Sequence, residues 1–182
     1  VGTTVATALK VRLKPGGTSV YVGAGVAEIP PLVMEALELD RQVVACNLRR
    51  QEVLLLNRAC GELPIRFQHV DAGSVKQRVD HLWLVSVLND PERFPELSVL
   101  SYGRANPVTF NAKKFVAQQR TVARLVDRCL SRLTVPGLVT TTVEEAVWVA
   151  EWCHRRGIPY RIDERTYASP TVGDPICLMR IG

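Results

Sequence analysis

Short apolar runs alternate along this chain with longer amphipathic segments, and Gly, Pro or Asn residues separate most of them. The apolar runs are rich in β-branched and aromatic residues and predict strands at residues 20–22, 42–46, 65–70, 81–88, 138–141, 160–165 and 176–181. The amphipathic segments repeat their apolar positions at helical spacing. They predict helices at residues 5–13, 29–39, 50–60, 112–133 and 142–156, the last opened by a capping box at Thr142 and Glu145.

The order of these elements predicts an α/β fold. Strands that alternate with helices form a mainly parallel sheet with helices on its faces. The run at 81–88 is almost continuously apolar, which is typical of a strand covered on both faces. The last two strands have no helix between them, so we expect them to pair antiparallel at the sheet edge. For 182 residues, the expected organisation is one domain spanning 1–182.

The segment SVYVGAGVAE, residues 19–28, has the layout of a first strand, a glycine turn and the start of a helix. Glycine permits the tight turn at Gly23, Ala24 and Gly25, and it lets a ligand approach the backbone without a Cβ in the way. Amides at the start of a helix suit a carboxylate, a hydroxyl or a phosphate. The turn therefore predicts a ligand site, although plain strand–helix turns also contain such glycine pairs.

Residues 89–111 show weaker periodicity than the rest of the chain. A long irregular connection inside a compact domain is typical of a lid or a binding loop, and this one includes Phe94, Tyr102 and Arg104. In an open α/β sheet, ligands bind beyond the carboxyl ends of the strands, where this segment must lie. We therefore expect a lid or substrate segment at 89–111. The alternative is a short helix at 95–101 followed by a connector.

This order of elements resembles the class I S-adenosylmethionine-dependent methyltransferases over nearly the whole chain. The resemblance implies S-adenosylmethionine as cofactor and a Rossmann-like three-layer α/β sandwich, with a mostly parallel seven-stranded sheet whose last strand is antiparallel. In that family a G-x-G-x-G loop holds the methionine part of the cofactor. Gly23, Ala24 and Gly25 match this loop, with Ala27 in place of the third glycine. The family's acidic residue two places before the first glycine is Tyr21 here.

Two further matches concern the nucleoside part of the cofactor. Where the family has an acid after the second strand for the ribose hydroxyls, this chain has Asn47, followed by Leu48. An amide oxygen accepts such a hydrogen bond without charge assistance. After the third strand, Asp71 and Ala72 match the positions that meet the adenine amino group and a ring nitrogen. The alternatives are structural, because Asn and Asp also begin and cap turns.

The fourth match is VDHLWLVSVLNDPERF, in which Asp80 opens the fourth strand and the residues from Ser86 to Asp90 match the family's active-site segment. The family resemblance places Ser86 at the cofactor. The N/D-P-P-Y/F signature of amino-group nucleic-acid methyltransferases is absent, which favours a small-molecule acceptor. Because a sulfonium cofactor is intrinsically activated, the protein mainly orients the reactants, and a base accepts a proton. The candidate catalytic residues are Asp90 and Tyr102, with Asn89 beside them. Asp90 is equally typical of a helix N-cap.

Composition narrows the class of protein. Hydrophobic residues make up 47% of the chain, and no apolar run approaches the roughly 20 residues that would span a membrane. The first residues have no signal-peptide pattern. The five cysteines are widely spaced and form no C-x-x-C pair, which argues against a zinc site or a disulfide framework. We therefore expect a cytoplasmic protein with buried thiols, no metal and no membrane contact.

The predicted helix at 112–133 has a basic stripe. Four arginines recur at every fourth residue and two lysines precede them: Arg120, Arg124, Arg128, Arg132, Lys113 and Lys114. With a net charge of +5, this stripe is a candidate contact surface for RNA or phosphate. Charged stripes are also usual on solvent-facing helices, and we favour that interpretation. Nucleic acid is therefore a possible partner but not the favoured one.

The sequence thus predicts an S-adenosylmethionine-dependent methyltransferase with an unidentified small-molecule acceptor, and RNA as the alternative acceptor. A nicotinamide-dependent oxidoreductase shares the strand–turn–helix, but its G-x-G-x-x-G pattern needs glycine where Glu28 stands. A non-catalytic relative is the third hypothesis, because Tyr21 and Asn47 replace expected acids. The oligomeric state stays open.

Overall fold

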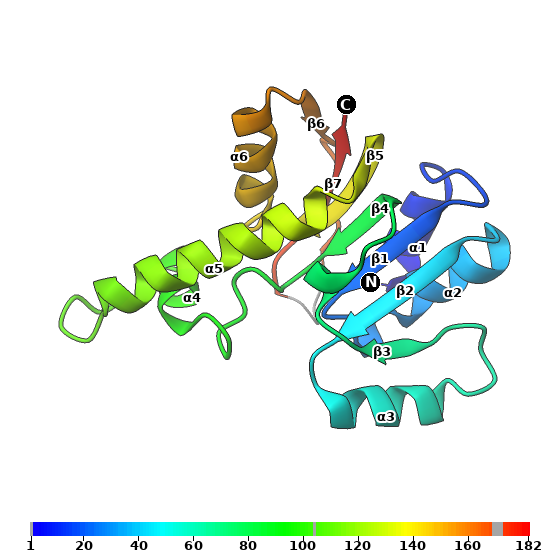
Figure 1. Cartoon of the computed structure of the whole chain (residues 1–182), viewed down its shortest axis with the longest axis horizontal. Coiled ribbons are helices and arrows are strands. Elements are labelled where there is room, and N and C mark those ends of the chain that lie inside the picture. The colour runs from blue at the N-terminus through cyan, green and yellow to red at the C-terminus, as the bar shows by residue number, and fades with distance from the viewer. Residues whose placement is uncertain (1, 104, 169–172) are drawn as a thin grey trace.

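A computed structural model describes residues 2–103, 105–168 and 173–182, and a seven-stranded sheet runs through its centre (Figure 1). The strands are β1 (Thr18–Val22), β2 (Gln42–Asn47), β3 (Phe67–His69), β4 (Val79–Leu84), β5 (Leu133–Thr142), β6 (Tyr160–Ile162) and β7 (Ile176–Ile181). Their order across the sheet is β3-β2-β1-β4-β5-β7-β6. Neighbours from β3 to β5 pair parallel, whereas β7 runs antiparallel to both β5 and β6. The predicted sheet with an antiparallel last strand is confirmed.

Helices cover both faces of this sheet. They are α1 (Gly2–Lys10), α2 (Ile29–Glu38), α3 (Arg50–Ala59), α4 (Pro95–Ser101), α5 (Ala112–Leu130) and α6 (Ala146–Arg156), with short 3-10 turns η1 (Val26–Glu28) and η2 (Ala72–Ser74). One apolar core includes residues of α1–α3, and a second includes residues of α4–α6. Along β1, Val20 and Val22 belong to one core and Tyr21 to the other, as strand geometry requires. The predicted three-layer sandwich is therefore confirmed. Within the described part of the chain, no helix is long and apolar enough to cross a membrane.

Several boundaries differ from the predicted ones. The run predicted as a strand at 81–88 leaves the sheet after Leu84, because the backbone at Ser86 takes a left-handed φ of +55°. The helix predicted to end at 133 ends at Leu130, and β5 already begins at Leu133. The last two strands do pair antiparallel at one end of the sheet, where β6 is the edge strand and β7 lies between β5 and β6.

The connections also correct two expectations. The capping box predicted at Thr142 and Glu145 forms only by half: the Thr142 hydroxyl accepts the Glu145 N–H at 3.2 Å, but the Glu145 carboxylate bonds to the chain after β4. β5 runs to Thr142, so α6 begins only at Ala146. Segment 89–111 contains α4, which is the helix that the alternative interpretation placed at 95–101. Arg104 of this segment lies outside the described residues.

A buried ionic cluster lies between α2, β1 and β4. The Arg41 side chain is fully buried, and its guanidinium donates to Glu35 at 3.0 Å and to Asp80 at 2.5 Å. The Ser19 hydroxyl lies 2.9 Å from the same guanidinium. Because Glu35 belongs to α2, Ser19 to β1 and Asp80 to β4, one arginine connects a helix with two central strands.

Tyr21 belongs to the same cluster. Its hydroxyl donates to Glu35 at 2.6 Å, and its ring stacks on Trp83 with 5.0 Å between centroids. His81 lies 2.9 Å from Glu35 through Nδ1. Burial by itself would raise the pKa of Glu35, but His81 and the hydroxyls of Ser19 and Tyr21 lower it to about 2. Tyr21 stands where the family has an acidic residue, and it donates a hydrogen bond to Glu35, an acid that belongs to α2.

Arg41→Met should lower the free energy of unfolding by about 3–5 kcal/mol, because the substitution removes the buried guanidinium that pairs with the Glu35 and Asp80 carboxylates. The matched control, Lys10→Met, removes an exposed ion pair with Glu38 and should cost less than about 1 kcal/mol. Urea denaturation of both variants, followed by circular dichroism, measures the two losses. Equal losses would contradict this role of Arg41.

Candidate functional site

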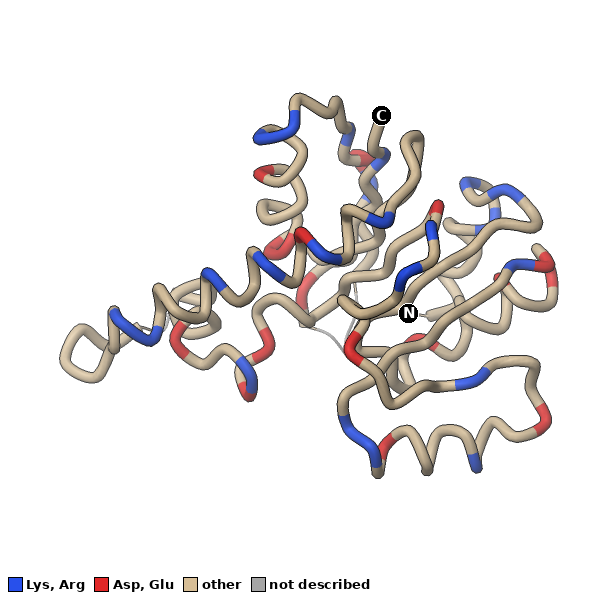
Figure 2. The backbone as a smooth tube through the Cα atoms, viewed as in Figure 1, with Lys and Arg blue, Asp and Glu red and all other residues tan. Residues whose placement is uncertain are grey.

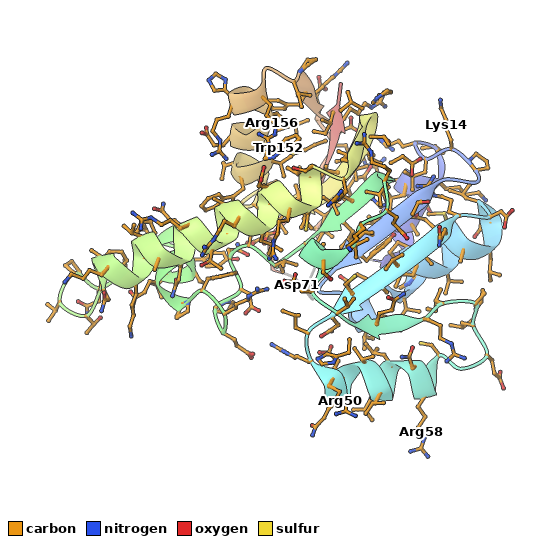
Figure 3. The ribbon with its side chains drawn as sticks, viewed as in Figure 1. Lys14, Arg50, Arg58, Asp71, Trp152 and Arg156 are labelled. Atoms are coloured by element: carbon orange, nitrogen blue, oxygen red, sulfur yellow. The ribbon has the colours of Figure 1, made fainter. Side chains whose placement is uncertain are left out.

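The sequence-predicted site residues gather at the carboxyl ends of β1, β2 and β4, around a cavity of about 500 Å³. Those that line it are Gly23, Asn47, Leu48, Asp71, Ala72, Ser86 and Asp90. Three predicted residues, Ala24, Gly25 and Tyr102, lie outside the lining as far as the described residues go. Asp71, which Figure 3 labels, and Leu125 of α5 both line this cavity. Small-molecule sites typically enclose roughly 300–1,000 Å³ at this edge of an α/β sheet.

The glycine turn follows β1 directly. Gly23 has a left-handed φ of +70°, and a Cβ built there would lie 3.1 Å from Val87 Cγ2. The backbone conformation therefore favours glycine at this position, and a Cβ would also require the Val87 side chain to shift. The Gly25 N–H donates to the buried Glu28 carboxylate at 2.8 Å, and burial raises the pKa of Glu28. Sequence reasoning did not find this contact, in which an acid fixes the turn from the helix side.

Asn47 joins the end of β2 to the glycine turn. Its Nδ2 donates to the Ala24 carbonyl at 2.8 Å, and its Oδ1 accepts the Arg49 N–H at 2.7 Å. Both ends of the side-chain amide are thus bonded to backbone, as the turn-forming alternative predicts. His69 supports the next residue, because its Nε2 lies 3.1 Å from the Leu48 carbonyl. Asn47 therefore shapes the wall of the cavity.

Asp71 follows β3 and caps η2. Its Oδ1 accepts the Gly73 N–H at 2.9 Å, and its Oδ2 lies 3.2 Å from the Arg128 guanidinium of α5. The turn-capping alternative is therefore present in the structure. Each carboxylate oxygen can accept a second hydrogen bond, so capping leaves Asp71 able to contact a ligand.

The two candidate catalytic residues have different environments. Asp90 lines the cavity, and its Oδ1 accepts the Glu92 N–H at 2.9 Å, so Asp90 begins a turn and does not cap α4. The Tyr102 hydroxyl donates to Asp174 at 2.5 Å and accepts from the Asn89 amide at 2.9 Å. Burial and the Asp174 carboxylate raise the pKa of Tyr102, which keeps its phenol protonated near neutral pH. Of the two, Asp90 presents a carboxylate to the cavity, whereas Tyr102 lies outside the lining as far as the described residues go.

Glu145 was not predicted as a site residue, yet its carboxylate holds the loop after β4. The side chain is fully buried and accepts the N–H groups of Ser86 at 2.9 Å, Leu88 at 2.5 Å and Asn89 at 3.3 Å. Ser86 has the left-handed backbone in this loop and lines the cavity. Glu145 thus fixes one cavity wall without lining it. The sequence did show an acid, Glu145, just after the strand predicted at 138–141. The capping-box interpretation assigned this acid to the start of the following helix.

The protonation of Glu145 is sensitive to burial. Burial raises its pKa to about 7, against the lowering effect of the amides of Leu88 and Asn89. The two carboxylate oxygens share the three N–H groups, and protonation turns one of these oxygens into a donor while leaving acceptor capacity on both. The Glu145 carboxyl group, which holds this loop, therefore changes its charge near neutral pH.

Charged side chains from α3 and from the start of segment 89–111 line the same cavity. Glu52 lies in the first turn of α3, and Arg49 precedes that helix. Arg49 donates to Glu92 at 2.5 Å and lies 4.0 Å from Glu52. The exposed Arg49–Glu92 pair joins the β2–α3 connection to segment 89–111. Sequence reasoning did not identify these residues, because no motif marks them.

The described residues offer few side chains that could bind a metal ion or act as a reactive thiol. In the residues that the structure describes, no group of three or more His, Cys, Asp or Glu side chains could hold a metal ion. All five cysteines are free and buried, as expected. Burial raises the pKa of Cys46 to about 12, so this cavity-lining thiol stays protonated at neutral pH.

This chain is similar to known proteins in structure but not in sequence. No family model and no curated protein matches the sequence. Magnesium protoporphyrin IX methyltransferase (ChlM) from Synechocystis PCC 6803, solved with bound SAM, matches with a TM-score of 0.61 and 10% identity over 98% of this chain and 78% of that chain. Precorrin-6y C5,15-methyltransferase from Geobacter metallireducens GS-15 matches with a TM-score of 0.58 and 11% identity over 99% and 85%. An rRNA methylase from Streptococcus thermophilus matches with a TM-score of 0.56 and 13% identity over 98% and 93%.

This chain has the class I methyltransferase fold. The resemblance inferred from the order of elements is thereby confirmed for the fold. The names of the matched proteins point to acceptors as different as magnesium protoporphyrin IX, precorrin-6y and rRNA. The fold by itself therefore leaves the acceptor undetermined, since function depends on the site.

Glu145→Gln should change how stability depends on pH. Because the pKa of Glu145 is raised from 4.5 to about 7 in the folded state, its contribution to stability is complete below pH 4.5 and is lost as the pH rises through about 7. The wild-type free energy of unfolding should therefore fall relative to that of the variant over this range, by up to about 3 kcal/mol at about 1.4 kcal/mol per pKa unit. Urea denaturation at a series of pH values measures the difference.

The exposed neighbour provides the control, because Glu144→Gln makes the same chemical change outside the buried loop contact. This control should follow the wild type across the pH range. A difference between wild type and Glu145→Gln that stays constant with pH would contradict the assignment.

Proposed function

We propose that this protein binds S-adenosylmethionine in the cavity and transfers its methyl group to an acceptor that enters beside segment 89–111. One observation carries the proposal: the glycine turn, the end of β2, the Asp71–Ala72 step and Ser86 meet at one cavity beyond the carboxyl ends of the strands. The fold supports it, because a matched structure of the same fold contains bound SAM.

The residues present fit such a cofactor. The cavity of about 500 Å³ lies within the size range of small-molecule sites, and Gly23 keeps its backbone open to a ligand. Both apolar and polar side chains line it, including Val22, Leu125 and Asp71. When bound, S-adenosylmethionine supplies a methyl group activated by its sulfonium. The protein's contribution is to orient the reactants and to exclude water.

Each wall of the cavity has a separate task in this proposal. The turn at Gly23 faces the methionine end of the cofactor, and Asp71 with Ala72 faces the adenine. Glu52 is the carboxylate available to the ribose hydroxyls, since the Asn47 amide is engaged with backbone. A hydrogen bond to a carboxylate is stronger than one to an amide oxygen. Glu52 thus supplies from α3 the charge that the end of β2 lacks.

Asp90 faces the acceptor in this proposal. It lines the cavity, and its Oδ2 has no hydrogen-bond partner among the described residues. This oxygen can accept the proton that an attacking hydroxyl or amine loses. Residues 1–182 then act as one unit, in which segment 89–111 positions the acceptor.

S-adenosylhomocysteine should bind the wild-type protein in isothermal titration calorimetry. Glu52→Gln should weaken this binding about tenfold or more, because hydrogen bonds to charged groups contribute about 1.5–3 kcal/mol. Glu62→Gln, which removes an exposed carboxylate after α3, should leave the affinity unchanged.

The result discriminates among the three functional hypotheses. No heat at millimolar S-adenosylhomocysteine would remove the basis for methyl transfer. Binding of NADH in its place would favour the oxidoreductase. A thermal midpoint that no nucleoside ligand shifts would favour a non-catalytic protein.

A further inference from the structure

Helix α5 presents a continuous basic face. At about 3.6 residues per turn, five of its cations project within an arc of roughly 120°, and a sixth follows just beyond the helix end. These residues, here named the α5 basic face, are Lys113, Lys114, Arg120, Arg124, Arg128 and Arg132. All six are exposed, and Figure 2 shows basic positions along the whole length of the helix.

The α5 basic face has almost no acidic counterparts. Among the described residues, only Arg128 of the six forms an ion pair, and its partner is Asp71 at the cavity. The single acid of the helix, Asp127, bonds to Trp152 and Arg156 of α6, which Figure 3 labels. Solvent-facing helices usually mix both signs, and like charges at i,i+4 are destabilising. An uncompensated stripe of this length therefore points to an anionic partner.

This face is continuous with the cavity. Arg128 contacts Asp71, and Leu125 of the same helix lines the cavity. The N-terminal half of α5 projects together with α4 away from the sheet (Figure 1). On the other flank, a groove of about 260 Å³ lies between α5 and α6. The residues that line this groove include Arg124, Arg155 and Arg156.

We propose that the α5 basic face binds the phosphate backbone of a nucleic-acid strand, and that this strand presents one nucleotide to the cavity as the methyl acceptor. The second half of this inference rests on the proposed function, whereas the first half does not. A nucleic-acid acceptor takes the place of the small molecule that the sequence favoured.

Dimensions and chemistry match such a strand. From Lys113 to Arg128 the face spans about 22 Å at roughly 1.5 Å per residue. This length corresponds to about six phosphates of a stacked strand at about 3.4 Å each. Arginines dominate the face, and their planar guanidinium groups bind phosphate oxygens in a bidentate manner.

Fluorescence anisotropy with a labelled RNA strand of about 20 nucleotides tests the binding. The variant Lys113→Gln/Arg120→Gln/Arg124→Gln removes three cations that do not line the cavity. Titrations between about 50 and 200 mM NaCl should show affinity reduced roughly tenfold or more. The slope of log affinity against log salt should fall by about 2, since each phosphate contact contributes about 0.7 for a single strand.

A matched control removes the same charge elsewhere. Lys14→Gln/Arg58→Gln/Arg66→Gln replaces three exposed cations, two of which Figure 3 labels on the side of the molecule away from α5. This control should bind the RNA within about twofold of the wild type. If both triple variants weaken binding equally, or neither does, the α5 basic face is not the binding surface and the inference is wrong.

Two further measurements distinguish nucleic-acid binding by the α5 basic face from methyl transfer at the cavity. A DNA strand of the same sequence tests whether the 2′-hydroxyl of RNA contributes to binding. The strand that binds the α5 basic face more tightly identifies the nucleic acid that the protein prefers. Calorimetry with S-adenosylhomocysteine should give the same affinity for the α5 variant as for the wild type. RNA binding without S-adenosylhomocysteine binding would support the surface and overturn methyl transfer, and the reverse result would overturn the surface alone.

Discussion

The buried ion pair between Arg41 and Glu35 connects the elements on which the cavity rests. Glu35 also receives the hydroxyls of Ser19 and Tyr21 from β1, and Arg41 reaches Asp80 on β4. β1 and β4 are adjacent central strands, and both end at the cavity. Because burying charges is costly, such a cluster contributes more to a defined arrangement than to net stability. We infer that it fixes these two strands and α2 relative to one another beneath the glycine turn.

The same principle recurs at the other end of β4. After Leu84 the chain leaves the sheet, so the amides of Ser86, Leu88 and Asn89 have no strand neighbours to bond. The Glu145 carboxylate accepts all three from the start of α6. Buried N–H groups without an acceptor would be costly, so this carboxylate permits the left-handed turn at Ser86 that forms one cavity wall. Both ends of β4 are thus held by side chains from other elements.

Local patterns predicted the order of elements well, because apolar periodicity depends on near neighbours in the sequence. Gly23, Asn47, Asp71 and Asp90 also lie together at one edge of the sheet, since parallel strands end together. What each side chain binds depends on distant elements. The Thr142–Glu145 pattern matched a capping box, yet the carboxylate accepts hydrogen bonds from amides 56 to 59 residues earlier in the chain. A short sequence segment around Glu145 does not include these amides, so it could not show which partner the carboxylate would bind.

The replacement of two expected acids is better understood in space than in sequence. Tyr21 and Asn47 stand where the family has acids, but Glu28 binds the Gly25 amide and Glu52 lines the wall beside it. A Cβ built on Gly25 would lie 3.2 Å from the Glu52 carboxylate, which shows how closely that charge approaches the turn. A ligand responds to the position of a charge and not to the element that supplies it. A helix start can therefore supply a carboxylate to the cavity where the strand end has none, and the departure of a motif residue alone is weak evidence that binding is lost.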